Sequence, residues 1–491
     1  MKHQEQRNQI DLDHEACYRA ICQHDARFDG RFFTGVKTTG IYCRPVCPAR
    51  VPLAKNVIFF PTAAAAQEAG FRPCLRCRPE TAPDLGAWRG TSNTVSRALS
   101  LIEHGALDED DADGLAGRLG VGERQLRRLF RQHLGASPVA VAQTRRILLA
   151  KQLIHETRLP MAEVAFASGF GSIRRFNETF QTLFGRPPSE LRRAGGPDFP
   201  AGPAGEIVLL LRYHPPYDWP AMIAFLERRA IGGLEHVTAE RYARTVQLDG
   251  LTGTVAVEPA RGNALCATVR FPKLSALPAI IARLRRVFDL GADPVAIAAH
   301  LAKDPTLKPL VKARPGLRVP GAWDGFELAI RAVLGQQITV TAAATLAGRL
   351  VARYGERLAA ADQHLTHVFP QPQSLASADL ATLGMPRSRA AALAAVAAAA
   401  VADPHLFEAN CGLDDAVKRL RAIRGVGEWT AQYIALRQLR EPDAFPAADL
   451  GLIRAMADRE GRGSSASELL DRADARRPWR AYAAQHLWAS A

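Results

Sequence analysis

Residues 38–50 read TTGIYCRPVCPAR, and residues 70–79 read GFRPCLRCRP. Together they hold two close pairs of cysteines, Cys43 with Cys47 and Cys74 with Cys77. Two such pairs, separated by a short insert, have the spacing that closes a tetrahedral thiolate site around one zinc ion. A purely structural site is the usual interpretation of this spacing. The pattern therefore predicts a small zinc domain.

Arginines surround these cysteines, at positions 44, 50, 72, 76 and 78. Five cations beside four thiolates suit a protein that presents sulfur to a phosphate. A reactive role for the cysteines is therefore the alternative to a purely structural site. The remaining cysteines, at positions 17, 22, 266 and 411, fit no ligand pattern.

The chain has 491 residues, too many for a single core, so we expect three or four domains. Its formal net charge of +14 indicates a polyanionic partner, with nucleic acid as the first candidate. Residues 1–13 contain no apolar run typical of a secretory signal, and no stretch is long and apolar enough to cross a bilayer. We therefore expect a cytoplasmic protein without a membrane partner, and metal thiolates rather than disulfides.

Two helix-turn-helix units are predicted between a break at 79–84 and a Pro/Gly linker. Apolar residues recur at helical spacing in both, and glycines interrupt the pattern where a turn is needed, at 120 and 122 and again at 169 and 171. The second helix of each unit is basic, with candidate DNA contacts at Arg124, Arg127, Arg174 and Arg175. Such arginines usually form a solvated face, but two tandem basic units favour DNA binding.

Residues 90–193 resemble the AraC-type DNA-binding domain, and the closing stretch FQTLFGRPPSELR at 180–192 is similar to that family's. The resemblance implies one recognition helix in each of two successive major-groove segments.

Residues 10–80 resemble the N-terminal domain of the Ada family, which repairs methylphosphotriesters in DNA. The residues that carry the resemblance are TTGIYCRP at 38–45 and GFRPCLRC at 70–77. It implies that Cys43, Cys47, Cys74 and Cys77 bind one zinc ion, which is both structural and thiolate-activating. It also implies that Cys43 takes a methyl group from a backbone phosphotriester. Arg44 and Arg72 are this domain's candidate DNA contacts.

The chemistry is reasonable because zinc keeps a thiolate deprotonated at neutral pH. Methylating one of four thiolates changes the formal charge of the site from −2 to −1, so DNA phosphates repel it less. We therefore expect DNA binding to strengthen after repair. The thioether does not readily leave, so each domain should act once. The PCHR-type stretch that often marks a second methyl acceptor in this family is absent from the sequence.

Residues 417–454 place Gly425 and Gly427 between two helical stretches, as in a helix-hairpin-helix. Such glycines let backbone N–H groups approach a phosphate, and Thr430 begins a helix whose N-terminus favours an anion. A tight turn between helices would also explain them. Asp449 lies downstream in a Pro/Ala loop before an apolar helix, where it could be catalytic or only an N-cap.

From about residue 206 onward the chain resembles helix-hairpin-helix DNA glycosylases, in particular the AlkA-type 3-methyladenine DNA glycosylases. The supporting stretches are PPYDWP at 215–220, ARPGLRVPG at 313–321, RAVLGQQ at 331–337, LGMP at 383–386 and PWRAYAAQHLW at 478–488. The resemblance implies that Asp449 stabilises positive charge on the deoxyribose as the N-glycosidic bond breaks.

Trp429, Tyr433 and Trp488 match aromatic residues that hold a flipped, alkylated base in that family, although aromatics at helical spacing are often only core. Bifunctional relatives carry a Schiff-base lysine two residues after the second hairpin glycine. Trp429 stands there, which predicts a monofunctional enzyme. Gln337 stands where AlkA-type enzymes place the leucine that fills the gap left by the base.

The predicted fold class is a multidomain α+β protein. Its expected parts are an Ada-type zinc methyl-acceptor domain at 8–82, an all-α double helix-turn-helix domain at 90–194, a linker at 195–205, a small AlkA-type α+β domain at 206–290 and an all-α helix-hairpin-helix glycosylase domain at 291–491. We assign no catalysis to the segment 206–285.

The predicted function is bifunctional repair and regulation in a bacterial cytoplasm, at the nucleoid. The expected partners are double-stranded DNA, both alkylated DNA and promoter operators, and RNA polymerase. One alternative is a transcriptional regulator whose C-terminal half is an inactive DNA-binding module. Another is a repair enzyme whose helix-turn-helix units only tether it to DNA.

Overall fold

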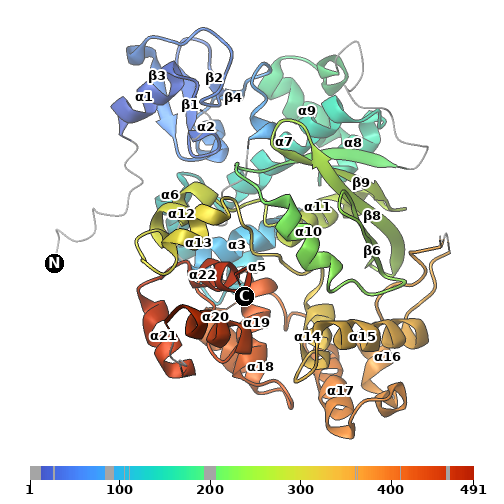
Figure 1. The fold of residues 1–491 in the computed structure, drawn as a ribbon. Helices are drawn as coiled ribbons and strands as arrows, with labels where there is room; N and C mark the ends of the chain where they lie inside the picture. The colour runs from blue at the N-terminus through green and yellow to red at the C-terminus, as the bar shows by residue number, and fades with distance from the viewer. Residues whose placement is uncertain are drawn as a thin grey trace. The chain divides into compact units, whose positions relative to one another are not determined.

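The computed structural model describes residues 13–25, 28–82, 93–103, 105–109, 111–192, 206–359, 361, 363–409, 411–460 and 465–490. The chain forms two compact units (Figure 1). The first contains Met1–His214 and Lys273–Ala282, and the second contains Pro215–Pro272 and Arg283–Ala491. The linker expected at 195–205 lies outside the described residues, as does the end of the break expected at 79–84.

The first unit begins with a small sheet whose strands lie in the order β3-β1-β2-β4. Its elements are α1 (His14–Cys22), β1 (Phe33–Val36), β2 (Ile41–Cys43), η2 (Ala54–Asn56), β3 (Val57–Phe60), α2 (Ala63–Glu68), β4 (Arg72–Pro73) and η3 (Pro79–Thr81). Strand β2 pairs with β1 in the antiparallel direction and with β4 in the parallel direction. Because β2 ends at Cys43 and β4 ends immediately before Cys74, the two neighbouring strands bring one cysteine of each pair together.

Helices make up most of the rest of this unit: α3 (Asn93–Glu103), α4 (Ala106–Glu109), α5 (Ala112–Arg118), α6 (Glu123–Leu134), α7 (Pro138–Glu156), α8 (Met161–Ala167), α9 (Ile173–Phe184) and η5 (Pro188–Leu191). The predicted helix-turn-helix units are α5 with α6 and α8 with α9. Gly120 and Gly169 adopt φ angles of 67° and 86° in the two turns, a left-handed conformation that glycine adopts without steric penalty. The unit also contains β5 (Ile207–Arg212), η6 (Leu274–Ala276) and the start of α11 (Leu277–Val287).

The cysteine module and the first helix-turn-helix share one hydrophobic core. Ala64 and Ala65 of α2 belong to the same buried cluster as Leu126 and Phe130 of α6. At the edge of this core the Thr62 hydroxyl donates to the Leu134 carbonyl at 2.7 Å. The two modules that the sequence suggests as separate domains therefore fold against each other in one unit.

The second unit combines a twisted sheet with a set of helices. Strands β6 (Glu235–Val237), β7 (Tyr242–Leu248), β8 (Leu251–Ala260) and β9 (Ala264–Arg270) pair in the antiparallel direction in the order β9-β8-β7-β6. The helices are α10 (Trp219–Glu227), the end of α11, α12 (Pro294–Leu301), α13 (Lys308–Ala313), α14 (Gly325–Leu334), α15 (Val340–Tyr354), α16 (Pro372–Ala376), η7 (Leu380–Leu383), α17 (Arg387–Ala402), α18 (Leu413–Arg421), α19 (Glu428–Arg437), α20 (Leu450–Glu460), α21 (Ala466–Asp474) and α22 (Arg480–Trp488).

The boundary expected between residues 290 and 291 lies inside this second unit. Asp289 is buried there and accepts hydrogen bonds from the Tyr482 hydroxyl at 2.8 Å and the Val319 N–H at 3.0 Å. The segment is therefore held by the helical part of the unit.

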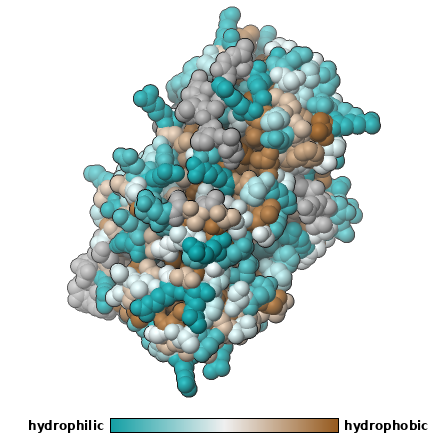
Figure 2. Space-filling view, turned by 90° about the vertical axis from the view of Figure 1, so that its right-hand side faces the viewer, coloured by the Kyte–Doolittle hydropathy of each residue, from teal (hydrophilic) through white to brown (hydrophobic). Residues whose placement is uncertain are grey.

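The face drawn in Figure 2 is mostly hydrophilic, with hydrophobic side chains in small groups. Within the described residues, no helix combines the length and the apolar character needed to cross a membrane.

Candidate metal centre, DNA-binding hairpin and base pocket

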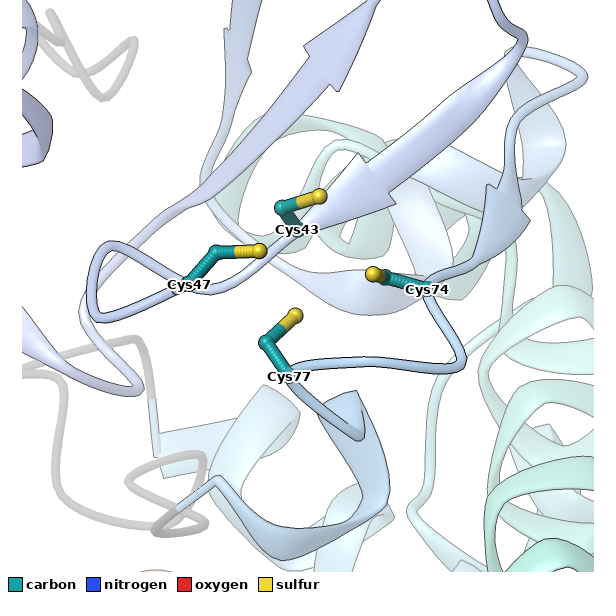
Figure 3. A group of neighbouring side chains, drawn as sticks. All are labelled: Cys43, Cys47, Cys74 and Cys77. Atoms are coloured by element: carbon teal, nitrogen blue, oxygen red, sulfur yellow. The ribbon is translucent and has the colours of Figure 1, made fainter. Parts of the chain in front are cut away.

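The four cysteine sulfurs point toward one another from β2 and from the loops that follow β2 and β4 (Figure 3). All four Sγ atoms lie within 4.8 Å of one another. Cys74 is fixed next to β2 because its N–H donates to the Tyr42 carbonyl at 3.0 Å. Four thiolates at this spacing fit one tetrahedral zinc ion, so the predicted four-cysteine metal site is confirmed.

The four sulfurs differ in exposure and in hydrogen bonding. Cys43 is partly exposed, whereas the other three are buried. The Arg44 N–H donates to Cys77 Sγ and the Arg76 N–H donates to Cys74 Sγ, each at 3.3 Å. Of the residues that the structure describes, none donates a backbone N–H to the Cys43 sulfur. Cys43 is therefore the most accessible of the four, and its sulfur keeps more free electron density than those of Cys74 and Cys77, which each accept an N–H group.

Arg44, a candidate DNA contact, points into the protein. Its Nε donates to Asp29 at 2.8 Å, and its Nη1 donates to the Cys77 carbonyl at 3.1 Å and to the Thr81 hydroxyl at 2.5 Å. This geometry favours a structural role for Arg44, which holds the loop that carries Cys77. Arg72, the other candidate of this domain, is partly exposed.

A buried ion-pair network joins the metal loop to α7. Lys151 of α7 donates to Glu80 at 2.7 Å, and both side chains have no solvent exposure. Arg78 donates to Glu80 at 3.1 Å and to Glu156 of α7 at 3.2 Å. Burial alone would raise the pKa of Glu80, but the charges of Lys151 and Arg78 lower it below its usual value. The helix that leads to the second helix-turn-helix is thus tied to the cysteine module.

The predicted DNA-contacting arginines of the two helix-turn-helix units are exposed on α6 and α9: Arg124, Arg127, Arg174 and Arg175. Arg127 and Arg174 each pair with a glutamate one turn away on the same helix, at 2.5 Å and 2.7 Å. Exposed pairs of this kind contribute little stability, so both guanidinium groups can exchange their glutamate for a phosphate.

The turn between α18 and α19 forms the predicted hairpin. Gly425 has a φ angle of 87°, and a Cβ atom there would lie 2.3 Å from the Cβ of Ala392. Gly427 immediately precedes α19, and a Cβ atom there would meet nothing within 4 Å. The two glycines therefore have different roles: Gly425 is required by packing, whereas Gly427 leaves an open approach to the start of α19.

Gln336 anchors this hairpin, a role that the sequence analysis missed. Its Nε2 donates to the Gly425 carbonyl at 3.0 Å and to the Thr430 hydroxyl at 3.1 Å. Thr430 is the third residue of α19 and its side chain is buried, so its hydroxyl supports the hairpin. The neighbouring Gln337 is exposed, with a φ angle of 58°, in the loop between α14 and α15.

We expect Gly425→Ala to destabilise the hairpin by about 2–5 kcal/mol, because the left-handed conformation costs about 1–2 kcal/mol and overpacking against Ala392 adds about 1–3 kcal/mol. Gly427→Ala is the matched control and should leave the unfolding transition within about 1 kcal/mol of wild type. Urea unfolding followed by tryptophan fluorescence measures both. Equal stability of the two variants would contradict the packing role of Gly425.

Asp449 lies at the start of α20 and accepts four hydrogen bonds. Its Oδ1 accepts from the N–H groups of Gly451 at 2.8 Å and Leu452 at 3.1 Å, and from Trp488 Nε1 at 2.8 Å. Its Oδ2 accepts from Trp429 Nε1 at 2.7 Å. The N-cap contact considered from the sequence is therefore present, yet it uses only Oδ1. Oδ2 has one protein donor and keeps acceptor capacity for a substrate.

A cavity of about 830 Å³ brings the predicted pocket residues together. Asp449 and the three predicted aromatics, Trp429, Tyr433 and Trp488, all line it. The rings of Trp429 and Tyr433 are stacked, with centroids 5.3 Å apart and planes at 17°. This arrangement places flat aromatic surfaces beside a fixed carboxylate, as stacking of a flipped base requires.

Arg437 is a buried pocket residue that the sequence analysis missed. Its guanidinium lies 4.9 Å from the centroid of the Tyr433 ring, 5.3 Å from that of Trp488 and 4.3 Å from that of Phe225. Burial lowers the pKa of Arg437 to about 10. Burial alone would raise the pKa of Tyr433, but the charges of Arg437 and Arg229 lower it. The spacing of residues 429, 433 and 437, one helical turn apart each time, is the signal that could have revealed it.

Four family models match the chain in sequence order. They are the metal binding domain of Ada at residues 16–80, a helix-turn-helix domain at 115–194, the AlkA N-terminal domain at 208–324 and the HhH-GPD superfamily of base excision DNA repair proteins at 330–480. A protein of Mycobacterium tuberculosis named probable bifunctional transcriptional activator/DNA repair enzyme AlkA is 43% identical over 478 residues, which cover 97% of this chain and 96% of the relative.

The chain belongs to the family of bifunctional transcriptional activator/DNA repair enzymes AlkA.

Other relatives match only one part of the chain each. DNA-3-methyladenine glycosylase 2 of Escherichia coli is 35% identical over 57% of this chain and 95% of its own length. The bifunctional transcriptional activator/DNA repair enzyme Ada of Escherichia coli is 37% identical over 25% of this chain and 33% of its own length. The solved 3-methyladenine DNA-glycosylase of Archaeoglobus fulgidus superposes with a TM-score of 0.51 at 22% identity, over 57% of this chain and 97% of that one, and shows the shared fold.

The comparisons confirm the zinc, helix-turn-helix and glycosylase parts of the predicted architecture, and the helix-turn-helix and glycosylase domains make this a DNA-binding protein. The roles of individual site residues rest on the geometry described above.

Proposed function

We propose that this protein performs two separate repair reactions and reports one of them to transcription. Cys43 accepts a methyl group from a DNA methylphosphotriester, and the cavity at Asp449 hydrolyses the N-glycosidic bond of alkylated bases such as 3-methyladenine. The observation that carries the proposal is that one chain holds a four-cysteine cluster in which Cys43 alone is partly exposed, and a carboxylate fixed beside stacked aromatics. The names of the relatives of each half support both reactions.

In the first reaction, the Cys43 sulfur attacks the methyl carbon. An S–C bond forms as the C–O bond breaks, and the phosphate oxygen leaves with the bonding pair as an ordinary diester. Zinc, when bound by the four cysteines, keeps the sulfur deprotonated. The product thioether holds the methyl group through a stable S–C bond, and nothing in this step removes it, so the acceptor works once.

In the second reaction, the N-glycosidic bond breaks, the base leaves with the bonding pair and positive charge builds on the deoxyribose. A water molecule then adds to the same sugar carbon and loses a proton, which completes the hydrolysis. Asp449 Oδ2 offers negative charge to that sugar, while Oδ1 is held by three N–H donors. The mutually stacked rings of Trp429 and Tyr433 offer one outer aromatic face to the base, with Trp488 lining the same cavity. Trp429 occupies the place of a Schiff-base lysine, so the enzyme releases the base without cutting the strand and acts as a monofunctional glycosylase.

The regulatory part of the proposal assigns operator recognition to α6 and α9, and recruitment of RNA polymerase to the DNA-bound protein. Arg72, Gln337 and the two hairpin glycines contact DNA in the repair steps. The domain ranges 8–82, 90–194, 206–290 and 291–491 remain our assignment. A protein that repairs and reads chromosomal DNA works at the nucleoid of the bacterial cytoplasm.

The proposal is tested by incubating the full chain with duplex DNA that contains methylphosphotriesters and mapping the modified peptide by mass spectrometry. We expect one methyl group on Cys43 and none on Cys47, Cys74 or Cys77. A methyl group on a different cysteine, or no transfer, would refute the acceptor assignment. Release of 3-methyladenine without strand cleavage from alkylated DNA tests the second reaction. An inert C-terminal half would support the regulator that lacks glycosylase activity.

Methylation of Cys43 should raise affinity for the promoter of the protein's own gene by at least about fivefold. The reason is that one negative charge is removed next to the DNA, and a like-charge contact at about 4 Å costs between about 1 and 4 kcal/mol. Gel-shift titrations of methylated and unmethylated protein at one salt concentration measure the change. Unchanged affinity would show that methylation of Cys43 does not regulate promoter binding. It would favour a repair enzyme whose helix-turn-helix units only tether it to DNA.

A further inference from the structure

A cavity of about 320 Å³ opens beside Cys43 in the first unit. Three of the four clustered cysteines, Cys43, Cys47 and Cys74, line it. Most of the remaining wall is apolar, from side chains that include Ile21, Ile41, Val51 and Leu75. The Cys43 sulfur therefore borders a space whose wall is mostly apolar.

This cavity is much larger than a methyl group. One water molecule takes up about 30 Å³ of liquid, and a methyl group is of similar size, so the volume is roughly ten times what a methyl group needs. An acceptor restricted to methyl groups could exclude longer chains by packing side chains against its nucleophile. The structure does not do so at Cys43.

The rim of the cavity, which we define by Arg50, Arg72 and Arg76, is charged, whereas the rest of its wall is mostly apolar. Arg50 and Arg76 are exposed and Arg72 is partly exposed, and all three contribute to the lining. A phosphotriester has the matching character, since its alkyl arm is uncharged while the diesters on either side of it along the strand are anionic. The rim arginines can hold those diesters, and the alkyl arm can then enter the apolar space.

We propose that Cys43 accepts primary alkyl groups larger than methyl, such as ethyl and n-propyl, from DNA alkylphosphotriesters. This inference rests on the proposed methyl transfer. The Cys43 sulfur attacks the first carbon of the alkyl chain, the S–C bond forms as the C–O bond breaks, and the phosphodiester leaves with the bonding pair. Each further CH₂ group buried in the cavity favours transfer by about fourfold, the equivalent of about 0.8 kcal/mol per buried CH₂.

The experiment uses the full zinc-loaded chain and three duplexes, each with one methyl, ethyl or n-propyl phosphotriester at the same linkage. Mass spectrometry follows the alkyl group onto Cys43, and a small free thiol reacted with the same triesters gives the intrinsic rates. We expect the ethyl-to-methyl rate ratio of the protein to exceed that of the free thiol by about fourfold, and the n-propyl ratio by more. A protein ratio equal to or below the thiol ratio overturns the inference, whereas absence of methyl transfer overturns the proposed function itself.

Two further measurements locate the alkyl chain. Ala49→Leu adds volume at the cavity wall and should lower the n-propyl-to-methyl ratio toward the free-thiol value. In the n-propylated protein, nuclear Overhauser contacts should join the propyl protons to the methyl groups of Ile41 and Val51. A propyl group that contacts neither side chain, in a protein with an unchanged ratio in Ala49→Leu, shows that the chain lies elsewhere.

Discussion

Replacing Asp449 with asparagine is expected to lower release of 3-methyladenine from alkylated DNA by at least roughly 10²–10³-fold. The substitution removes the negative charge that faces the sugar. It also places an amide against a hydrogen-bond donor, because both carboxylate oxygens accept N–H groups and Trp429 donates to Oδ2 at 2.7 Å. Quantifying the released base under single-turnover conditions measures the loss.

Asp449→Asn has two effects, the loss of negative charge and the contact between its amide and the Trp429 indole N–H, and a second substitution distinguishes them. Trp429→Phe removes the donor and keeps an aromatic ring, so Asp449→Asn combined with Trp429→Phe has no opposed donors. We expect the double variant to remain as inactive as Asp449→Asn, while Trp429→Phe alone keeps measurable activity. Recovery of activity in the double variant, or full activity of Asp449→Asn, would show that the carboxylate charge is not what drives base release.

The metal site could be predicted from sequence because its information is local. The spacing of each cysteine pair is set within a few residues, and zinc geometry requires the two pairs to meet. The helix-turn-helix units were predictable for the same reason, since helical spacing of leucines and a left-handed glycine such as Gly120 are short-range signals. Each of these predictions depends on residues that are close together in the sequence.

Apart from Arg437, the missed features join distant parts of the chain. Trp429 and Trp488 could be predicted as pocket aromatics, but not as donors to Asp449, because their indoles approach it from positions 20 and 39 residues away. Lys151 meets Glu80 across 71 positions. An isolated lysine or glutamate in a sequence predicts solvent exposure, and only the fold shows that these two charges are buried together. The pairing of Arg44 with Asp29 could not be predicted for the same reason, since Asp29 lies outside the motif.

The buried pair between the metal loop and α7 gives the last strong expectation: Lys151→Met should destabilise α7 by about 3 kcal/mol. Removing one partner of a buried ion pair costs about 3–5 kcal/mol, and the lower value applies because Arg78 still donates to Glu80. Hydrogen exchange of α7 peptides in the full chain should accelerate by roughly 10²-fold. Peptides of α19, in the second unit, provide the internal reference.

Two variants and the pH dependence decide whether charge is responsible. Lys151→Met with Glu80→Leu removes both charges and should regain most of the lost protection, whereas Arg127→Met breaks an exposed pair and should cost less than about 1 kcal/mol. The lowered pKa of Glu80 means that its ion pair stabilises the fold above about pH 4.5 and loses this effect as the pH falls further. The difference between wild type and Lys151→Met should therefore shrink in acid. If α7 exchanged at the wild-type rate in Lys151→Met at neutral pH, the ion-pair network would not be what holds the metal loop to this helix. Coupling between the cysteines and the helix-turn-helix units would then have to run through the apolar core that α2 and α6 share.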